Sequence, residues 1–338
     1  MGSSRARSRS TTSVTSGVTD AATTPPPSWA VGIVNHGSYR DLAGCLDSVA
    51  RQTCPPRRVY VWDTGVDPAA LDELAKAHPG VSFEHGSNRG FAGGGNRAVA
   101  TLRQDAEFVL ILNPDVVLDA DFAEKLLYSV EAEPDVAIAG GKLLRPGREL
   151  IDSAGIRFPR HRRPRDRGSE SPDRGEFDRR ERIEAVSGAA MLLREAAIDG
   201  LSIEGELFDE VFFAYHEDTD LCWRARRFGW TVLYEPAAVA VHGRGWRSGR
   251  RAEIPVAIRR HSFKNHYLQL VKNETLAGFL MNAPWLIGWE VLRLGFVLIR
   301  DRGMLGAYRE TWRELPGAWR KRRLIGEIAR NSGNASRR

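Results

Sequence analysis

Two alternating patterns of apolar residues run along the first half of the chain. Short, almost continuously apolar segments are typical of buried strands, and apolar residues that recur every three or four positions are typical of amphipathic helices. Strands that alternate with helices and are apolar on both faces predict an α/β fold, in which helices cover both faces of a mostly parallel sheet. The predicted strands are residues 30–34, 59–62, 81–83, 108–112 and 136–139, and helices are predicted over 42–49, 67–77 and 121–131 and after the glycine-rich residues 90–96.

Three more apolar segments follow in the second half and predict further strands, at residues 186–193, 230–234 and 237–241. A loop that is dense in arginine, residues 157–182, precedes them. This composition is typical of a solvated insertion, and the arginines would also suit a flap that contacts an anionic ligand.

An acidic stretch, residues 216–224, follows an apolar aromatic run and holds three carboxylates within four residues. We predict that a helix begins here, with Glu217 and Asp218 at its exposed entrance, because acidic side chains are favoured in the first turn of a helix. Asp220 can pair with Arg224 one turn later. A well-capped surface helix would by itself explain such a cluster, so its function depends on the rest of the chain.

Residues 277–299 form a markedly apolar stretch near the C-terminus. It contains Trp285 and Trp289 but is interrupted by Pro284, Glu290 and other polar residues, and basic residues follow it. We expect an amphipathic segment that lies in the interface of an anionic membrane, with tryptophan at the boundary and arginine toward the head groups. A buried core helix is the alternative.

Composition divides the chain into four parts. We predict a disordered tail over residues 1–28, an α/β domain over 29–250 with a flexible loop at 157–182, a helical region over 251–325 that associates with the membrane, and a basic tail over 326–338. Three scattered cysteines argue against a disulfide framework and favour a reducing compartment.

The net charge of +6 permits a nucleic-acid partner. The arginines, however, gather in the predicted tails and one loop and are not interleaved with aromatic residues on a helix face. We therefore expect no nucleic acid as a partner.

Polar residues stand where several predicted strands end. Asn35, Asp63, Asn88 and Asp115 fall at the carboxyl edge of the sheet, where ligands bind in folds of this class. Asp115 closes the tripeptide that begins at Asn113, and a carboxylate there can hold Mg²⁺ or Mn²⁺ against a diphosphate. This pattern predicts a nucleotide site, and another strand-end residue, His242, could complete the shell of the metal ion.

The glycine-rich stretch also admits a different class of enzyme. Gly93, Gly95 and Ala98 formally fit the fingerprint of dinucleotide-binding proteins, so an NAD-dependent oxidoreductase is an alternative. That fingerprint normally follows the first strand of the sheet, whereas two strand–helix units precede it here.

Five motifs together resemble the family 2 glycosyltransferases of the GT-A fold, especially the branch of rhamnosyltransferases and galactofuranosyltransferases. They are VGIVN, VWDTG, NRGFAGGGN, NPD and FFAYHEDTDLCWR, in this order along the chain, and the third and the last are specific. The resemblance covers residues 31–242 and implies a GT-A catalytic domain.

The resemblance also implies roles for individual residues. Asp218 matches the general base of the family, with Glu217 beside it, while Asp115 and His242 match the metal ligands. The positions that match donor-binding residues are Asn35, Asp63, Asn88, Gly90, Phe91, Gly93, Asn96 and Asn113.

These roles describe an inverting, metal-dependent transferase at the cytoplasmic face of the cell membrane. The expected donor is a nucleotide sugar, dTDP-L-rhamnose in the first place and UDP-galactofuranose or another UDP-sugar as the alternative. The expected acceptor is a cell-envelope glycan or a polyprenyl-diphosphate-linked glycan.

Overall fold

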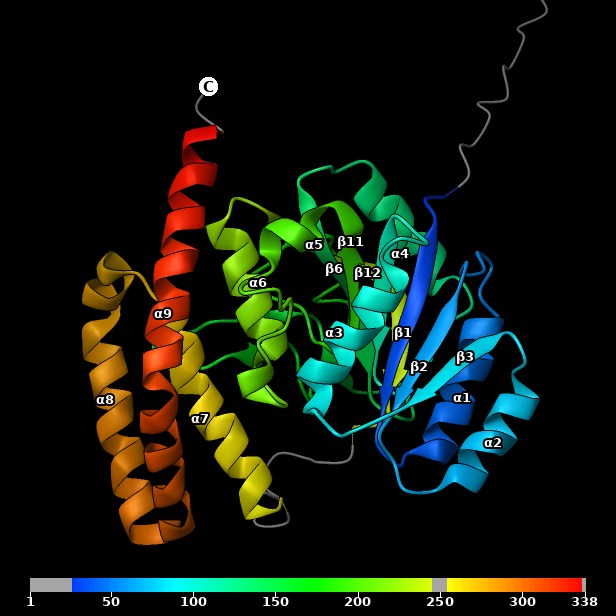
Figure 1. The fold of residues 1–338 in the computed structure, drawn as a ribbon. Coiled ribbons are helices and arrows are strands. Elements are labelled where there is room, and N and C mark those ends of the chain that lie inside the picture. The colour runs from blue at the N-terminus through cyan, green and yellow to red at the C-terminus, as the bar shows by residue number, and fades with distance from the viewer. Residues whose placement is uncertain (1–25, 245–253, 336–338) are drawn as a thin grey trace, which may run out of the picture.

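The computed structural model describes residues 26–244 and 254–335. One large sheet forms the centre of the molecule, and helices lie on both of its faces (Figure 1). The strands of this sheet are β1 (Trp29–Asn35), β2 (Val59–Asp63), β3 (Val81–His85), β4 (Phe108–Leu112), β5 (Val116–Leu118), β6 (Val136–Leu144), β7 (Ile151–Ser153), β10 (Glu181–Arg182), β11 (Ala190–Arg194) and β12 (Thr231–His242). The long helices are α1 (Tyr39–Ala50), α2 (Pro68–Ala77), α3 (Gly90–Leu102), α4 (Phe122–Glu131), α6 (Glu217–Arg227), α7 (Val256–Asn273), α8 (Leu276–Arg300) and α9 (Leu305–Ala335), and α5 (Glu195–Leu201) is short.

The main path of the sheet runs β10-β12-β6-β11-β4-β1-β2-β3. Strands β1 to β4 pair in parallel, and β12 is parallel to β6, but β11 is antiparallel to both of its neighbours. The α/β prediction is therefore confirmed, with a mixed sheet. Two predicted strands form the single strand β12, because its register with β6 shifts between Glu235 and Val239 instead of ending there.

The strands are apolar on both faces because each face is covered. On one side Leu42 of α1 and Leu126 of α4 pack in one core cluster. On the other side α3 and α6 contribute residues such as Leu102 and Leu221 to a second cluster. Asp67 caps α2 by accepting from the Ala70 amide at 3.1 Å, as its place before Pro68 predicts.

The glycine-rich stretch is the first turns of α3 and not a loop. A Cβ at Gly94 would lie 2.5 Å from a methyl group of Val34, and one at Gly95 would lie 3.0 Å from the Phe208 ring. These glycines therefore let α3 approach the sheet and the segment before α6 closely.

The segment 157–182 is more regular than the sequence predicts. It contains β9 (Arg165–Asp166), which pairs with β8 (Ile156–Arg157), and ends close to β10. Arg167 pairs with Glu181 at 3.0 Å, and the ammonium of Lys142 contacts Asp173 and Asp178. Acidic residues of the segment thus pair both within the segment and with Lys142 of β6.

The ends of the chain differ in part from the prediction. Most of the expected N-terminal tail, residues 1–25, lies outside the described residues, but Ser28 donates to Glu107 through its backbone amide at 2.9 Å. The expected basic tail is wrong for residues 326–335, since α9 continues to Ala335 and Ile328 packs against the core. The helical spacing of Leu324, Ile325 and Ile328 explains this packing.

The C-terminal region consists of the three helices α7, α8 and α9, which lie beside α6, with α8 outermost (Figure 1). Helix α7 is joined to the sheet domain by buried polar bonds, such as Lys272 to Asp209 at 2.6 Å and Asn273 to Asp220 at 2.7 Å. Within residues 26–244 and 254–335, no helix has the length and apolar character needed to cross a membrane.

Candidate active site

The carboxyl ends of β1 and β2 bring Asn35 and Asp63 together. The Asn35 amide donates to Asp63 Oδ1 at 2.6 Å, and both side chains are buried. Asp63 Oδ2 accepts from the Tyr39 hydroxyl at 3.2 Å and lies 3.1 Å from His85 Nδ1. The two predicted donor-binding residues are therefore adjacent, and their hydrogen bonds hold the edge of the site in shape.

Sequence reasoning missed the exposed residues of this edge. His85 projects over Asp63 with a half-exposed ring, and His36 is exposed with its Nδ1 3.0 Å from the Thr64 hydroxyl. His36 directly follows β1 and His85 ends β3, so their position at strand ends was the signal that could have found them. Both side chains are accessible from solution at this edge of the site.

At the next strand ends, Asp115 and His242 approach each other. His242 Nε2 lies 3.4 Å from Asp115 Oδ1, because the end of β12 pairs with β5, which directly follows Asp115. His242 Nδ1 lies 2.7 Å from Asp152 Oδ2. Burial disfavours the charged ring, but the hydrogen bonds to Asp115 and Asp152 outweigh burial and raise the pKa of His242 to about 9.

These residues fit one end of a divalent-cation site. Asp152 holds the Nδ1 side of the ring and leaves Nε2 facing the carboxylate, the arrangement that orients histidine toward a metal ion. Asp115 is 27% exposed and can therefore reach a ligand from solution. In the described part of the chain no three His, Cys, Asp or Glu residues gather to enclose an ion. Oxygen atoms of a bound diphosphate and water would thus have to supply the remaining ligands.

Asp218 lies next to the same strand ends. Its Oδ2 accepts from the Gly188 amide at 2.9 Å, and the neighbouring Ala189 carbonyl accepts from the Asn113 amide at 2.9 Å. A Cβ at Gly188 would lie only 3.1 Å from the Asp218 Cβ, so any larger residue there would crowd Asp218. Residues 188 and 189 thus connect Asp218 to the end of β4, two residues from Asp115.

Arg244 lies between Asp218 and the acidic residues around His242. Its guanidinium lies 3.4 Å from Asp152 Oδ1 and 3.1 Å from Asp166 Oδ2, and the charge of Asp218 helps to raise its pKa against the effect of burial. The predicted base and the predicted metal ligands therefore share one region of the molecule. Sequence reasoning missed Arg244, Asp152 and Asp166, because only the fold brings them together.

The two catalytic candidates differ in protonation. Burial raises the pKa of Asp218, and hydrogen bonds from the Gly188 and Thr219 amides oppose that rise. Burial and then the charge of Asp218 raise the pKa of Glu217 well above its ordinary value. Glu217 Oε2 is also buried and has no hydrogen-bond partner in the part of the chain that the structure describes, so the predicted exposed helix entrance is wrong for Glu217.

A strained turn leads into α6. Phe213, Tyr215 and His216 all have positive φ, at 62°, 72° and 72°. The Asn265 amide of α7 donates to the carbonyls of Phe212, Ala214 and Tyr215 at 2.7, 2.8 and 2.8 Å. Helix α7 thereby fixes the turn that places Asp218.

The glycine-rich stretch contributes differently from the expectation. The amides of Gly90, Ala92 and Gly93 already donate to Asn88 Oδ1, the Phe213 carbonyl and the Arg89 carbonyl. They are therefore not available as a cradle for phosphate oxygens.

Two other residues of this stretch point into the protein. The Asn96 amide donates to the Phe208 carbonyl at 2.8 Å, and the Phe91 ring contacts the Phe208 ring with centroids 6.1 Å apart. Asn88 is exposed beside them. The stretch thus supports the segment before α6, and Asn88 is its accessible side chain.

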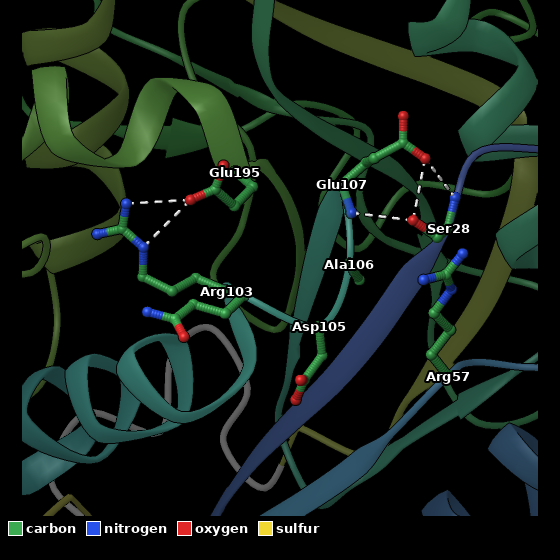
Figure 2. Close-up of a pocket in the computed structure, with 8 residues that line it drawn as sticks. Ser28, Arg57, Arg103, Asp105, Ala106, Glu107 and Glu195 are labelled. Carbon is green, nitrogen blue, oxygen red and sulfur yellow. Dashed lines mark hydrogen bonds and ion pairs between the residues drawn. The ribbon is translucent and has the colours of Figure 1, made fainter.

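A separate hollow lies at the opposite edge of the sheet, at the start of β1 and β4 (Figure 2). Within it Arg103 contacts Glu195, and Glu107 accepts hydrogen bonds from the amide and the hydroxyl of Ser28. It contains none of the predicted site residues.

Comparison with protein families identifies the fold and its chemistry. The sequence profile of glycosyl transferase family 2 matches residues 30–199, half of the 338-residue chain. The chain belongs to this family. It is a glycosyltransferase of the hexosyltransferase class, which confirms the resemblance drawn from the motifs and leaves the dinucleotide interpretation without support.

Two relatives carry rhamnosyltransferase names. The chain is 27% identical over 231 residues to N-acetylglucosaminyl-diphospho-decaprenol L-rhamnosyltransferase of Mycobacterium tuberculosis, covering 61% of this chain and 72% of the relative. It is 25% identical over 230 residues to the rhamnosyltransferase WbbL of Escherichia coli, covering 62% and 81%.

Solved structures agree with the fold. GalNAc-T7, solved with UDP, GalNAc and Mn²⁺, superposes with a TM-score of 0.56 at 14% identity over 73% of this chain, which spans about half (49%) of that protein. A mannosyltransferase of Pyrobaculum calidifontis, solved with GDP-Man and Mn²⁺, gives a TM-score of 0.51 at 16% identity over 91% of this chain and 87% of its own.

Proposed function

We propose that the protein is an inverting glycosyltransferase that moves L-rhamnose from dTDP-L-rhamnose to a polyprenyl-diphosphate-linked or other cell-envelope glycan. The observation that carries this proposal is the hydrogen bond from the Gly188 amide to Asp218, because it holds a carboxylate beside the strand end that bears Asp115. The names of both rhamnosyltransferase relatives support the choice of sugar, and the name of the Mycobacterium tuberculosis relative supports a diphosphate-linked acceptor.

Asp218 is the proposed base. Its Oδ2 is oriented by the Gly188 amide and Oδ1 by the Thr219 amide, so the carboxylate has a fixed direction. A pKa raised by burial suits a group that takes a proton near neutral pH. The base removes the proton of the acceptor hydroxyl as the oxygen attacks the anomeric carbon from the face opposite the departing diphosphate, and the transition state is oxocarbenium-like, as in glycoside hydrolysis.

Asp115 and His242 are the proposed residues for a divalent cation, Mg²⁺ or Mn²⁺. When bound, the ion would neutralise charge on the departing diphosphate. The solved mannosyltransferase and GalNAc-T7 both contain Mn²⁺, which supports a cation in this family. Arg244 lies beside these residues and offers a fixed positive charge to the same region.

The proposed location is the cytoplasmic face of the cell membrane, with α8 in the interface. Large apolar side chains of α8 are exposed on most of its length, and exposed arginines follow. Such a face suits an anionic membrane surface. The apolar residues are Leu276, Phe279, Leu280, Met281, Trp285, Ile287, Val291, Leu292, Leu294, Phe296, Leu298 and Ile299.

A UDP-sugar such as UDP-galactofuranose is the alternative donor, since it would use the same base and cation. We propose a thermal-shift comparison of dTDP-L-rhamnose and UDP-sugars with and without Mn²⁺, because a ligand of the folded state raises the unfolding temperature. Stabilisation by dTDP-L-rhamnose that requires Mn²⁺ is the expected result. Equal stabilisation by UDP-galactofuranose would move the proposal to the other donor.

Transfer itself is tested with Asp218→Asn. This variant should lower kcat by about 10²–10⁴-fold, because the base is lost, while the thermal shift with donor and Mn²⁺ stays. The control Asp199→Asn changes an exposed aspartate on the far side of α5. Normal turnover by Asp218→Asn would remove Asp218 from the reaction.

A further inference from the structure

A group of basic side chains from four different segments meets beside the start of α6. The rings of His216, the N-cap of α6, and His266 of α7 have centroids 6.1 Å apart. Arg293 of α8 and Arg163 both lie close enough to add to the lowering of the pKa of these two rings. We call His161, Arg163, His216, His266 and Arg293 the basic cluster.

Several buried polar atoms in and around the basic cluster have no hydrogen-bond partner among residues 26–244 and 254–335. His266 is 2% exposed, and neither of its ring nitrogens has a hydrogen-bond partner. The Gln269 Nε2 and Arg293 Nη1 atoms are also buried without one. The carboxylate nearest to Arg293 Nη1, that of Glu290, stands 3.6 Å away and accepts from Tyr267. Buried donors are normally satisfied, so this group indicates a ligand that is rich in acceptor atoms.

The charge of the cluster defines the ligand further. Burial, and then the charge of Arg163, lowers the pKa of His216 to about 4, and burial with Arg293 lowers the pKa of His266 well below its ordinary value. Each imidazole is therefore neutral and offers one N–H donor, and the two arginines supply the positive charge. Arginine with neutral N–H donors is a typical environment for phosphate oxygens.

The position of the cluster links the two parts of the proposed reaction. His216 stands two residues before Asp218. On the other side, the His161 ring stacks on Trp289 of α8 at 4.5 Å, and the Arg160 guanidinium lies 4.2 Å over the Trp285 ring. Trp285 belongs to the exposed apolar face of α8. A ligand held here would have the base at one end and an apolar surface at the other.

We propose that the basic cluster binds the diphosphate of a lipid-linked acceptor and so sets the acceptor sugar against Asp218 while the lipid lies along α8. This inference rests on the proposed function, because it assumes that the acceptor carries a diphosphate. The cluster is separate from Asp115 and His242, to which the diphosphate of the nucleotide sugar is assigned.

The first test measures binding without any reaction. Inorganic pyrophosphate and farnesyl diphosphate are added to the full-length protein in the presence of a chelator, so that no cation recruits them to Asp115 and His242. Both should raise the unfolding temperature, and farnesyl diphosphate should bind more tightly because its chain reaches the apolar face. Equal affinity for both would overturn the lipid assignment, and the absence of a shift with either would overturn the site.

Three variants locate the binding. Arg163→Gln removes a charge from a half-buried position, and His266→Phe keeps the aromatic volume but removes both ring nitrogens. Each should weaken binding of farnesyl diphosphate by about tenfold or more, as expected for the loss of a charge-assisted or buried hydrogen bond. Arg157→Gln, an exposed change in the neighbouring strand β8, should have no effect. If Arg163→Gln fails to fold, His266→Phe decides, and wild-type affinity in either folded variant would contradict the proposal.

Kinetics then separate this inference from the function on which it rests. With a diphosphate-linked acceptor, Arg163→Gln should raise the acceptor KM by about tenfold and leave the KM for the nucleotide sugar unchanged. An equal rise in both KM values would contradict acceptor binding at the cluster. If the wild-type protein binds farnesyl diphosphate but transfers no sugar to any diphosphate-linked acceptor, the proposed function fails and the site stands.

Discussion

Two neighbouring carboxyl groups of α6 show how much a single position changes the chemistry of a residue. Asp218 receives hydrogen bonds from two backbone amides, whereas Glu217 Oε2 is buried and finds no partner among the described residues. The first environment stabilises a carboxylate and the second a neutral carboxyl group. Of the two carboxyl groups, Asp218 therefore fits the proposed base better, since the pKa of Glu217 is raised well above its ordinary value.

This difference predicts a change in the pH dependence of stability for Glu217→Gln. Below its ordinary pKa, Glu217 is protonated in both the folded and the unfolded chain. As the pH rises above that value, the unfolded chain loses the proton while the folded protein keeps it, because the folded pKa is raised. The contribution of Glu217 to the free energy of unfolding therefore falls by about 1.4 kcal/mol for each further pH unit, until the pH passes the folded pKa.

Glutamine does not titrate, so Glu217→Gln should unfold with a weaker decline in stability between mildly acidic and neutral pH. Urea unfolding at several pH values measures this effect. Glu73→Gln, on the exposed face of α2, serves as the control and should follow the wild type. A Glu217→Gln curve parallel to that of the wild type would contradict the assignment of a neutral Glu217.

At the scale of elements, helix α7 holds the turn from which α6, the helix of Asp218, begins. Asn265 occupies one position of α7 and satisfies three carbonyls of the turn that contains Phe213, Tyr215 and His216. Side chains in this backbone region cost energy, so the turn persists because its surroundings hold it. Helix α7 is thus structurally part of the site that contains Asp218.

Asn265→Ala should therefore damage both stability and catalysis. Three carbonyls lose their donor, and we expect a loss of about 2–4 kcal/mol in the free energy of unfolding, with kcat lowered by about tenfold or more because Asp218 is no longer held in place. Denaturant unfolding and steady-state kinetics measure the two effects. Asn282→Ala removes a bond to Gly278 within α8 itself and should change kcat little. A stable Asn265→Ala protein with normal kcat would refute the support role.

The glycines of α3 predict a second effect at this scale. Gly94→Ala places a methyl group 2.5 Å from Val34, and overpacking of this kind costs about 1–3 kcal/mol. Gly44→Ala in α1 meets nothing within 4 Å and should stabilise the protein by about 0.5–1 kcal/mol. Thermal unfolding of both variants tests the prediction that Gly94→Ala lowers and Gly44→Ala raises the stability. Destabilisation by Gly44→Ala would show that helix propensity does not determine the effect at residue 44.

The sequence predicts those parts of the molecule that depend on local pattern. The strand ends at Asn35, Asp63 and Asp115 and the cap at Asp67 follow from short stretches of residues. The antiparallel direction of β11, the continuity of β12 and the burial of Glu217 were not predictable in this way, because each depends on partners far along the chain. The same reason explains why Asp152, Arg244 and Asn265 were missed: none stands in a recognisable motif, and each acts across more than 20 residues, as in the bond between Asp152 and His242.

At the scale of the whole molecule, one side differs from the rest. Single exposed apolar residues such as Val66 are normal on any protein surface, but α8 exposes many of them in succession. The basic cluster lies inside this side of the molecule, near Trp285 and Trp289, and exposed Arg300 and Arg302 lie at its end. The arrangement suits an enzyme that takes its acceptor from a membrane surface.

The double variant Leu292→Glu and Ile299→Glu tests this orientation. The two side chains are 71% and 76% exposed, so the charges should leave the fold intact while removing apolar area that would enter the membrane. We expect the partition coefficient for vesicles of phosphatidylglycerol and phosphatidylcholine to fall by at least about tenfold, since full burial of each side chain contributes about 1.5–3 kcal/mol. Co-sedimentation with vesicles measures the partition. Val66→Glu, a change at a site that is 95% exposed beyond β2, is the control and should bind as the wild type does. If the double variant keeps the unfolding temperature of the wild type and binds vesicles equally well, α8 does not contact the membrane.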